Sequence, residues 1–204
     1  GSGKSTLLSL LIRLYDDYEG TIQIEGKDIR SYSYNAIRNY ITYVPQNPLL
    51  LNDSIKNNIT LCNDKFSEED IIKAAKQAEI HDFITLLPDD YNTIIGDRGC
   101  NLSGGQQQGI SLTRAFIKDS PILLIDEGTA ALDPELESNV MSNIINNMND
   151  KTMIIVSHKI STVLNADYIY VFNDGKIIES GNPKELFLRN GYFRSMANLQ
   201  NIKL

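Results

Sequence analysis

The hexapeptide "GSGKST" at residues 1–6 indicates the fold class of this chain. Its glycines let backbone N–H groups turn toward a phosphate, Lys4 can reach the β and γ phosphates of a nucleotide, and the Ser5 hydroxyl suits Mg²⁺. The following "LLSLLIRLY" places apolar side chains at positions 7, 8, 11, 12 and 15 on one helical face. The positive N-terminus of that helix points at the loop. A Gly-Ser-Gly run also occurs in flexible linkers, so the hexapeptide needs support from the rest of the chain.

Two continuous apolar runs, "PILLIDE" at 121–127 and "KTMIIVSH" at 151–158, are typical of buried parallel strands with functional groups at their carboxyl ends. Asp133 and Pro134 between them form an N-cap and a first-turn proline, so we expect a crossover helix from Pro134 to about Met148. These three segments predict a strand-helix-strand unit. The chain is therefore expected to have an α/β core.

The remaining segments predict further strands and helices of that core, and one helical insertion within it. "TIQIEGKDIR" predicts a strand with a turn at Gly26, "ITYV" a short strand before Pro45, and "DYIYVFNDGKIIES" a hairpin around residues 173–175. A cap at 182–185 predicts the last helix. Residues 50–118 are helical in pattern, with Ser67 as one N-cap and a second helix after residues 104 and 105. We predict an α/β core from 1–46 and 119–204, and a helical subdomain from 47–118.

The composition of the chain argues against some classes of function. The chain has 204 residues, is 42% hydrophobic and carries a formal net charge of -7, which argues against nucleic acid as a partner. No apolar run approaches the roughly 18 residues that a membrane span needs. Cys62 and Cys100 lack metal or disulfide spacing and are expected to be free thiols.

The adjacent acids Asp126 and Glu127 end one of the predicted strands. One carboxylate in such a pair can serve Mg²⁺ and the other an attacking water, although two acids can also simply begin a solvated loop. His158 ends the other predicted strand, where it can be either a functional or a structural imidazole. The presence of a phosphate loop in the same chain favours a functional role for the acid pair and for His158.

Four further motifs resemble those of the ATP-binding-cassette (ABC) family and occur in the family's order. "YVPQNP" at 43–48 resembles the Q-loop, "LSGGQQQ" at 102–108 the signature, "AALD" at 130–133 the D-loop and "VSHK" at 156–159 the H-loop. "LPDDYNTIIGDRGCNLSGGQ" and "YVFNDGKIIESGNPKELF" resemble the exporter branch. The resemblance spans nearly the whole chain. It implies a P-loop NTPase (RecA-like) mixed sheet flanked by helices, with an inserted α-helical subdomain.

The same resemblance implies ATP and Mg²⁺ as ligands and a role for each matching residue. Glu127 would be the general base, His158 the γ-phosphate sensor, and Gln46 a contact to both the metal and the water. The metal ligands implied are Ser5, Gln46 and Asp126. The residues implied to bind ATP are Gly1, Ser2, Gly3, Lys4, Ser5, Thr6, Gln46, Asp126 and His158.

The signature implies a partner. In the family, this motif closes on the nucleotide of a second copy, or of a homologous domain, in a head-to-tail dimer. A helix N-terminus with exposed N–H groups suits such an anion. The residues implied are Leu102, Ser103, Gly104, Gly105 and Gln106 of the signature and Ala131, Leu132 and Asp133 of the D-loop. ATP binding would close the dimer, and hydrolysis would weaken it.

The chain departs from the family pattern at three places. Gly109 replaces a common arginine, and a glycine inside a helix costs about 1 kcal/mol. Gly128 replaces alanine or proline and is expected to loosen the backbone beside Glu127. The phosphate loop starts partway through, so we expect the chain to belong to a longer protein with an upstream membrane domain, and to bind ATP weakly when isolated.

The function predicted from these motifs is that of the ATPase motor of an exporter at the cytoplasmic face of a membrane, with a peptide, lipid or drug as cargo. A chromosome or repair ATPase is an alternative, but only 98 positions separate Lys4 from Leu102, without the heptads of a coiled coil. A nucleotide clamp with impaired turnover is a second alternative. The presence of Glu127 and His158 argues against it.

Overall fold

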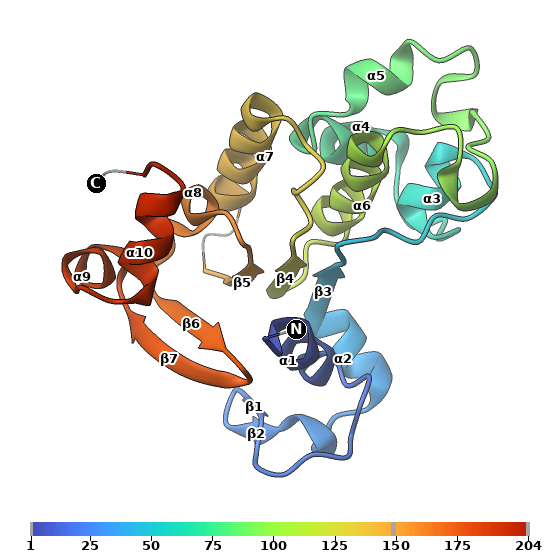
Figure 1. Cartoon of the computed structure of the whole chain (residues 1–204). Coiled ribbons are helices and arrows are strands. Elements are labelled where there is room, and N and C mark those ends of the chain that lie inside the picture. Colours follow the sequence, from blue (N-terminus) through green and yellow to red (C-terminus); the bar gives the residue numbers. More distant parts are fainter. Residues whose placement is uncertain (1, 148–149, 203–204) are drawn as a thin grey trace. The chain divides into compact units, whose positions relative to one another are not determined.

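The computed structural model describes residues 2–147 and 150–202, which form two compact units (Figure 1). The first unit contains Gly1–Ile37 and Ile155–Leu204, and the second contains Arg38–Ile154. The predicted helical segment 47–118 lies wholly within the second unit. The division into an α/β core and a helical subdomain remains a prediction.

The first unit contains two antiparallel hairpins. β1 (Gln23–Ile24) pairs with β2 (Lys27–Asp28), and β6 (Ile169–Asn173) pairs with β7 (Lys176–Gly181). The first turn has Glu25 and Gly26 at φ 52° and 76°, and the second has Asp174 and Gly175 at φ 45° and 73°. Two successive residues with positive φ are the signature of the tight hairpin turn that matches strand twist. The predicted turn at Gly26 and the predicted hairpin around residues 173–175 are both confirmed.

The helix of the phosphate loop is shorter than expected. α1 (Lys4–Leu11) begins directly after Gly3, but of the predicted apolar face only Leu8 is buried. Arg13 leaves the helical conformation at φ 55°, and its guanidinium donates to the carbonyl oxygens of Ile29 and Tyr32. These contacts hold the chain in a turn, so the extension of the helical face to residue 15 is wrong.

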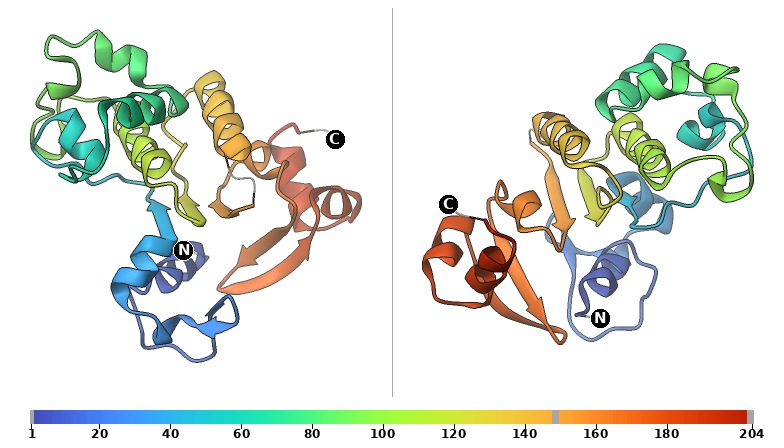
Figure 2. Two further views of the ribbon diagram at one scale, coloured as in Figure 1. Left: turned by 180° about the vertical axis from the view of Figure 1, so that it is seen from behind. Right: turned by 45° about the horizontal axis from the view of Figure 1, so that its top comes forward.

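Helices cover the second hairpin of this unit, as both views of Figure 2 show. Leu186 of α9 (Pro183–Leu188) and Phe193 of α10 (Tyr192–Leu199) are buried in one cluster with Ile169 of β6 and with Ile160 of α8 (Ile160–Val163). The cap at Asn182 is confirmed, because its side chain accepts from the Glu185 N–H. α9 is not the last helix, since α10 follows it. The short helix η1 (Ile29–Ser31) lies in the first unit, and α2 (Tyr34–Tyr40) includes residues of both units, which divide after Ile37.

The second unit contains the parallel strands β3 (Ile41–Val44) and β4 (Ile122–Asp126), which pair with each other. β5 (Thr152–Val156) is next in the order β3-β4-β5, and its last two residues are assigned to the first unit. The burial of β4 along its length agrees with the prediction of an apolar interior strand. Parallel strands place their carboxyl ends at one edge of the sheet, so Gln46, just past β3, and Asp126 lie at that edge.

Helices make up the rest of the second unit. They are α3 (Ile55–Thr60), α4 (Glu68–Gln77), α5 (His81–Thr85), η2 (Asp90–Asn92), η3 (Asp97–Gly99), α6 (Gly104–Lys118) and α7 (Pro134–Asn147). The predicted end of the crossover helix at Met148 lies outside the described residues. Among the residues described, no helix is both long and apolar enough to cross a bilayer.

Side-chain caps start four of these helices, the first being α3, where Ser54 Oγ accepts from the Asn57 N–H. Ser67 and Ser103 each form a capping box with the third residue of α4 and α6, namely Asp70 and Gln106. The Asp133 carboxylate accepts from the Leu136 N–H at the start of α7, at 3.0 Å. The predicted caps at Ser67 and Asp133 are therefore confirmed, because capping depends on residues only three positions apart.

Candidate functional site

The phosphate-loop residues lie in the first unit. Gly3 has φ 89°, a left-handed conformation that favours glycine, and a Cβ on it would lie 3.6 Å from Gly175 Cα in the second hairpin. Lys4 Nζ donates to Ser2 Oγ at 2.8 Å, and the Gly175 N–H donates to the Ser2 carbonyl at 3.2 Å. Ser5 and Thr6, in the first turn of α1, are exposed. Gly1 lies outside the described residues.

His158 also belongs to the first unit, two residues after β5. It is exposed, and its carbonyl oxygen accepts from Gln200 Nε2 at 2.8 Å. The Gln200 side chain also accepts from the Ile160 N–H at 2.8 Å. Gln200 thus ties both sides of the histidine segment to the end of α10. Sequence reasoning missed this residue, because 42 positions separate it from His158.

The carboxylates lie at the end of β4 in the second unit. Asp126 is only 5% exposed, and its Oδ2 accepts from the Tyr43 hydroxyl at 3.3 Å. Burial, together with the negative charge of Asp126, raises the pKa of Tyr43 to about 12, so the phenol stays protonated at neutral pH. Tyr43 was not singled out from the sequence. Its place in β3, beside β4, brings its hydroxyl to the Asp126 carboxylate.

Glu127 follows directly and is held by its neighbours. Its φ of 51° is left-handed, a conformation that costs about 1 kcal/mol or more for a residue other than glycine. Gln46 Nε2 donates to Glu127 Oε2 at 2.8 Å, and the Ala130 N–H donates to the Glu127 carbonyl at 3.0 Å. The structure therefore places two of the expected catalytic residues, Gln46 and Glu127, in direct contact.

Gly128 does not loosen this segment. It is buried, and a Cβ on it would lie 2.6 Å from Val44 Cγ1 and 3.1 Å from Ile125 Cγ2. The expectation of a looser backbone is corrected. The absence of a side chain lets the Glu127 turn pack closely on the ends of β3 and β4.

The signature and D-loop residues meet within the second unit. A Cβ on Gly105 would lie 3.1 Å from the Ala131 carbonyl oxygen, and one on Gly104 would lie 3.5 Å from Ala131 Cβ. Leu132 is buried. The capping residue Ser103 and its neighbour Gly104 are exposed. The start of α6 is therefore supported by the D-loop and still accessible from outside.

Each of the three glutamines after Gly105 has a different environment. Gln106 Oε1 accepts from the Ser103 N–H at 2.8 Å, and Gln107 Nε2 donates to the carbonyl oxygens of Gly99 and Leu102. Gln108 is only 3% exposed and contacts backbone near Gln46, Glu127 and Ala131. Helical periodicity was the available signal, because position 108 lies one turn before the buried Leu112.

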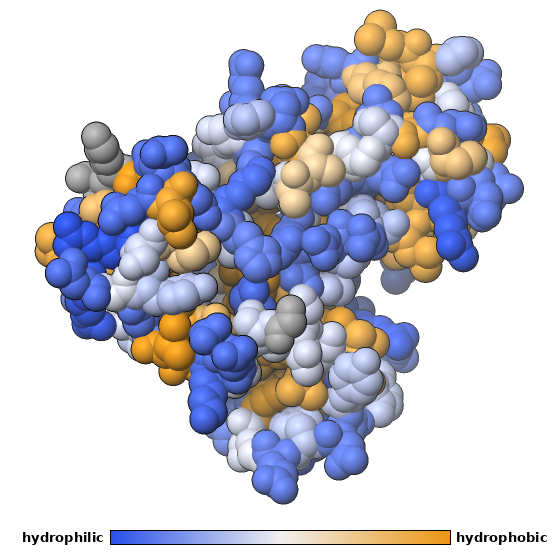
Figure 3. Space-filling model, viewed as in Figure 1, coloured by the Kyte–Doolittle hydropathy of each residue, from blue (hydrophilic) through white to orange (hydrophobic). Residues whose placement is uncertain are grey.

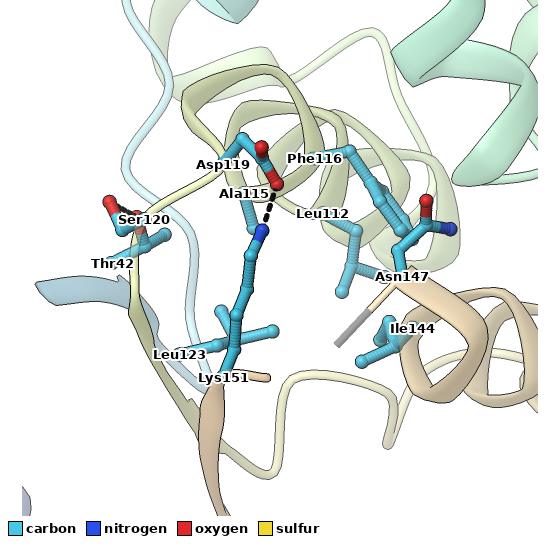
Figure 4. Close-up of a pocket in the computed structure, with 10 residues that line it drawn as sticks. All are labelled: Thr42, Leu112, Ala115, Phe116, Asp119, Ser120, Leu123, Ile144, Asn147 and Lys151. Carbon is cyan, nitrogen blue, oxygen red and sulfur yellow. Dashed lines mark hydrogen bonds and ion pairs between the residues drawn. The ribbon is translucent and has the colours of Figure 1, made fainter. Parts of the chain in front are cut away.

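A shallow apolar pocket lies elsewhere in the second unit, near the amino ends of the strands (Figure 4). Leu112, Leu123 and Ile144 line it, and an ion pair between Lys151 and Asp119 crosses its rim. None of the expected site residues contributes to its lining.

In the same unit, Cys62 and Cys100 are exposed and free, as expected.

Each unit carries oxygen donors of a kind that suits a hard cation. The second unit has the Asp126 carboxylate and the Gln46 amide oxygen, and the first unit has the Ser5 hydroxyl. Oxygen atoms of these kinds are the ligands that Mg²⁺ prefers. Within the described ranges, no three His, Cys, Asp or Glu side chains gather in a group fit for a metal. Mg²⁺ needs no such group, because it is commonly held by one or two carboxylates and the phosphates of the substrate.

A glycine-bearing loop that opens a helix, and a carboxylate pair at the end of a buried parallel strand, define the class of P-loop nucleotide-binding proteins. The family model described as "ABC transporter" matches residues 1–130. The chain belongs to the ABC transporter family. The resemblance inferred from its motifs is thereby confirmed.

Relatives and a solved structure agree with this assignment. The ABC multidrug transporter atrD of Emericella nidulans is 44% identical over 99% of this chain and 15% of its own length. The ATP-dependent lipid A-core flippase of Desulfotalea psychrophila is 44% identical over 98% of this chain and 35% of its own. The structure of a bacterial Atm1-family ABC exporter with ATP bound matches with a TM-score of 0.94 and 39% identity, over 99% of this chain and 35% of that one. The expected fold class is confirmed, and the chain spans about a third or less of these proteins.

Proposed function

We propose that this chain is the ATP-binding and ATP-hydrolysing motor domain of an ABC exporter. The contact between Gln46 and Glu127 beside the buried Asp126 carries the proposal, because it joins a water-positioning amide to a candidate base. The similarity to an exporter with ATP bound, and to relatives named as a multidrug transporter and a lipid flippase, supports export as the process driven.

In this proposal the first unit binds phosphate. Backbone N–H groups of residues 1–6 and the N-terminus of α1 attract the phosphate oxygens, and Lys4 neutralises charge on the β and γ phosphates. The Ser5 hydroxyl is the metal ligand of this unit. His158 would sense the γ phosphate and hold the attacking water. The hydrogen bonds of Gln200 keep the His158 backbone in place for that role.

The second unit would supply the chemistry of hydrolysis. Glu127 takes a proton from the attacking water as general base, while Gln46 orients the same water. Asp126 and Gln46 would hold Mg²⁺, which when bound neutralises charge on the phosphates. Tyr43 donates to Asp126 Oδ2 and thereby fixes the orientation of this carboxylate.

The domain would act as a head-to-tail dimer with a second copy or a homologous domain. The accessible Ser103 and Gly104 at the start of α6 offer the Ser103 hydroxyl and the Gly104 N–H to the γ phosphate bound by the partner. The residues proposed to act across this interface are Leu102, Ser103, Gly104, Gly105 and Gln106, with Ala131, Leu132 and Asp133 of the D-loop. Closure on ATP followed by hydrolysis would give a clamp cycle.

A membrane-spanning partner completes the proposal, with the domain at the cytoplasmic face. A relative from Staphylococcus aureus, 41% identical over 99% of this chain and 35% of its own length, is named as a putative multidrug export ATP-binding/permease protein. Apolar side chains are exposed on the helical region of the second unit (Figure 3), and Leu49, Leu86 and Ile94 are among the exposed residues. We propose that they contribute to the contact with the membrane-spanning partner, because contiguous exposed apolar patches mark such surfaces, whereas single exposed apolar residues are common. The proposed cargo is a peptide, a lipid or a drug.

The test is phosphate release by the intact transporter and by its Glu127→Gln variant. The amide has the shape of the carboxylate but cannot accept the proton, so we expect hydrolysis to fall by about 100-fold or more. ATP binding, measured with a fluorescent analogue, should persist. Equal hydrolysis rates in the two proteins would remove Glu127 from its proposed role, and no hydrolysis in either would favour a clamp without turnover.

A further inference from the structure

Gln108 makes three hydrogen bonds to backbone groups in three different segments of the second unit. Its Oε1 accepts from the Ala131 N–H at 2.8 Å. Its Nε2 donates to the Gln46 carbonyl at 3.3 Å and to the Glu127 carbonyl at 3.5 Å. The side chain is almost completely buried, with 3% exposed. One amide thus joins the segments after β3 and β4 to the D-loop.

The three hydrogen bonds place strict requirements on the side chain at position 108. The Gln108 amide is the buried polar group here, and leaving such a group without a hydrogen-bond partner costs about 1–3 kcal/mol. A side-chain amide suits the place because it offers one acceptor and two donor hydrogens in a fixed plane. A carboxylate lacks the donors and an apolar side chain lacks both. A simple space-filling role does not require glutamine.

One of these hydrogen bonds holds the backbone of Glu127, which has an unusual conformation. Glu127 has φ 51°, and such a conformation persists only when the surroundings determine it. The Glu127 carbonyl accepts from Ala130 N–H and from Gln108, while its carboxylate accepts from Gln46. Gln108 therefore contacts the backbone of both residues in the Gln46–Glu127 pair.

We infer that Gln108 is a positioning residue for ATP hydrolysis, which holds the Gln46 amide and the Glu127 carboxylate in register with the D-loop. The inference rests on the proposed function, because it takes Glu127 as base and Gln46 as the group that orients water. Gln108 is almost completely buried and would act through its backbone contacts, not on the water or the nucleotide directly. Its effect is geometric, and displacement of a catalytic group by about 1 Å can cost 100-fold in rate.

The test uses the intact transporter with Gln108→Met, which keeps the length of the side chain and removes its hydrogen-bonding atoms. We expect kcat to fall by about 10- to 100-fold, while the Kd for ATP changes by less than about threefold. Thr113→Val is the matched control. It removes a buried hydrogen bond in the same helix, from Thr113 Oγ1 to the Gly109 carbonyl, without touching the three segments.

Comparing the change in kcat with the change in the Kd for ATP distinguishes a positioning role of Gln108 from a role in stability alone. If Gln108→Met and Thr113→Val show the same kcat at matched folded fractions, the inference is overturned. If Gln108→Met does not fold, Gln108→Glu at pH 8 replaces it, because the ionised side chain retains the acceptor for Ala131 and loses both donors. A folded Gln108→Glu protein with the kcat of the parent would overturn the inference as well.

Glu127→Gln, assayed in parallel, distinguishes failure of the inference from failure of the proposed function. Full hydrolysis by Glu127→Gln would contradict the role of the base, whatever Gln108 does. Loss of hydrolysis in Glu127→Gln together with normal kcat in Gln108→Met would contradict only the positioning role. Loss in both, with intact ATP binding, supports both statements.

Discussion

At the scale of single residues, Gly109 shows how packing decides what a position tolerates. It lies within α6 and is buried, and a Cβ on it would lie 2.6 Å from Ile80 Cδ1 and 3.2 Å from Ile80 Cβ. Gly109 therefore faces the interior at Ile80. The glycine lowers the helix propensity of α6 but permits this close approach.

Gly109→Ala is expected to destabilise the protein in spite of a gain in helix propensity. Alanine improves propensity by about 1 kcal/mol, whereas overpacking of a buried contact costs about 1–3 kcal/mol. We expect the free energy of unfolding in urea to fall by about 1 kcal/mol. Ile80→Val removes the atom nearest to the new methyl group, so Gly109→Ala should cost less in that background. Equal costs in the two backgrounds would contradict the role of Ile80.

Arg114 is a second residue whose importance lies in its contacts. Its guanidinium donates to the carbonyl oxygens of Asn58 and Leu49 and to Asn58 Oδ1, and burial lowers its pKa to about 10. Arg114→Met removes these three charge-assisted hydrogen bonds, although Asn58 Oδ1 still accepts from the Leu51 N–H, so we expect about 3 kcal/mol less unfolding free energy in urea. Arg189→Met, which removes a half-exposed ion pair with Glu185, should change it by about 0.5 kcal/mol or less. Similar losses in both variants would contradict this interpretation.

At the scale of elements, α4 and α6 begin with the same kind of N-cap but have different proposed roles. Ser67 caps α4 and Ser103 caps α6, each through a capping box. Replacing either serine with alanine should cost about 1 kcal/mol of stability. Only Ser103→Ala should also reduce ATP hydrolysis by the intact transporter, by about tenfold, because a charge-assisted hydrogen bond is worth about 1.5–3 kcal/mol. Phosphate release and thermal unfolding of both variants test this, and equal activity would contradict the role of Ser103.

The same scale shows what the sequence could predict. Both hairpin turns and the caps at Ser67 and Asp133 were predicted correctly, because each depends on residues within a few positions of one another. The early end of α1 was not predicted, because it depends on hydrogen bonds from Arg13 to carbonyl groups 16 and 19 positions away. Similarly, the contacts of Gln108 span 19 to 62 positions. Motifs identify the residues of the candidate site, but only the fold shows which side chains hold them.

At the scale of the whole molecule, the proposed dimer divides each ATP site between two chains. Lys4 of one copy and Ser103 of the other would act on the same nucleotide. Co-expression of two differently tagged intact proteins, one with Lys4→Ala and one with Ser103→Arg, tests this division. Each variant alone should be inactive, because both of its sites are damaged.

The mixed dimer should regain hydrolysis, since one of its two sites combines an unaltered Lys4 from one chain with an unaltered Ser103 from the other. We expect up to about half of the parent rate from tandem-purified heterodimers, if the sites act independently. The control pairs a double variant, Lys4→Ala with Ser103→Arg, with an unaltered chain. There each site keeps one lesion, so activity should stay low. Recovery in the control and none in the mixed dimer would show that Lys4 and Ser103 serve one site within a single chain, and would contradict the head-to-tail arrangement.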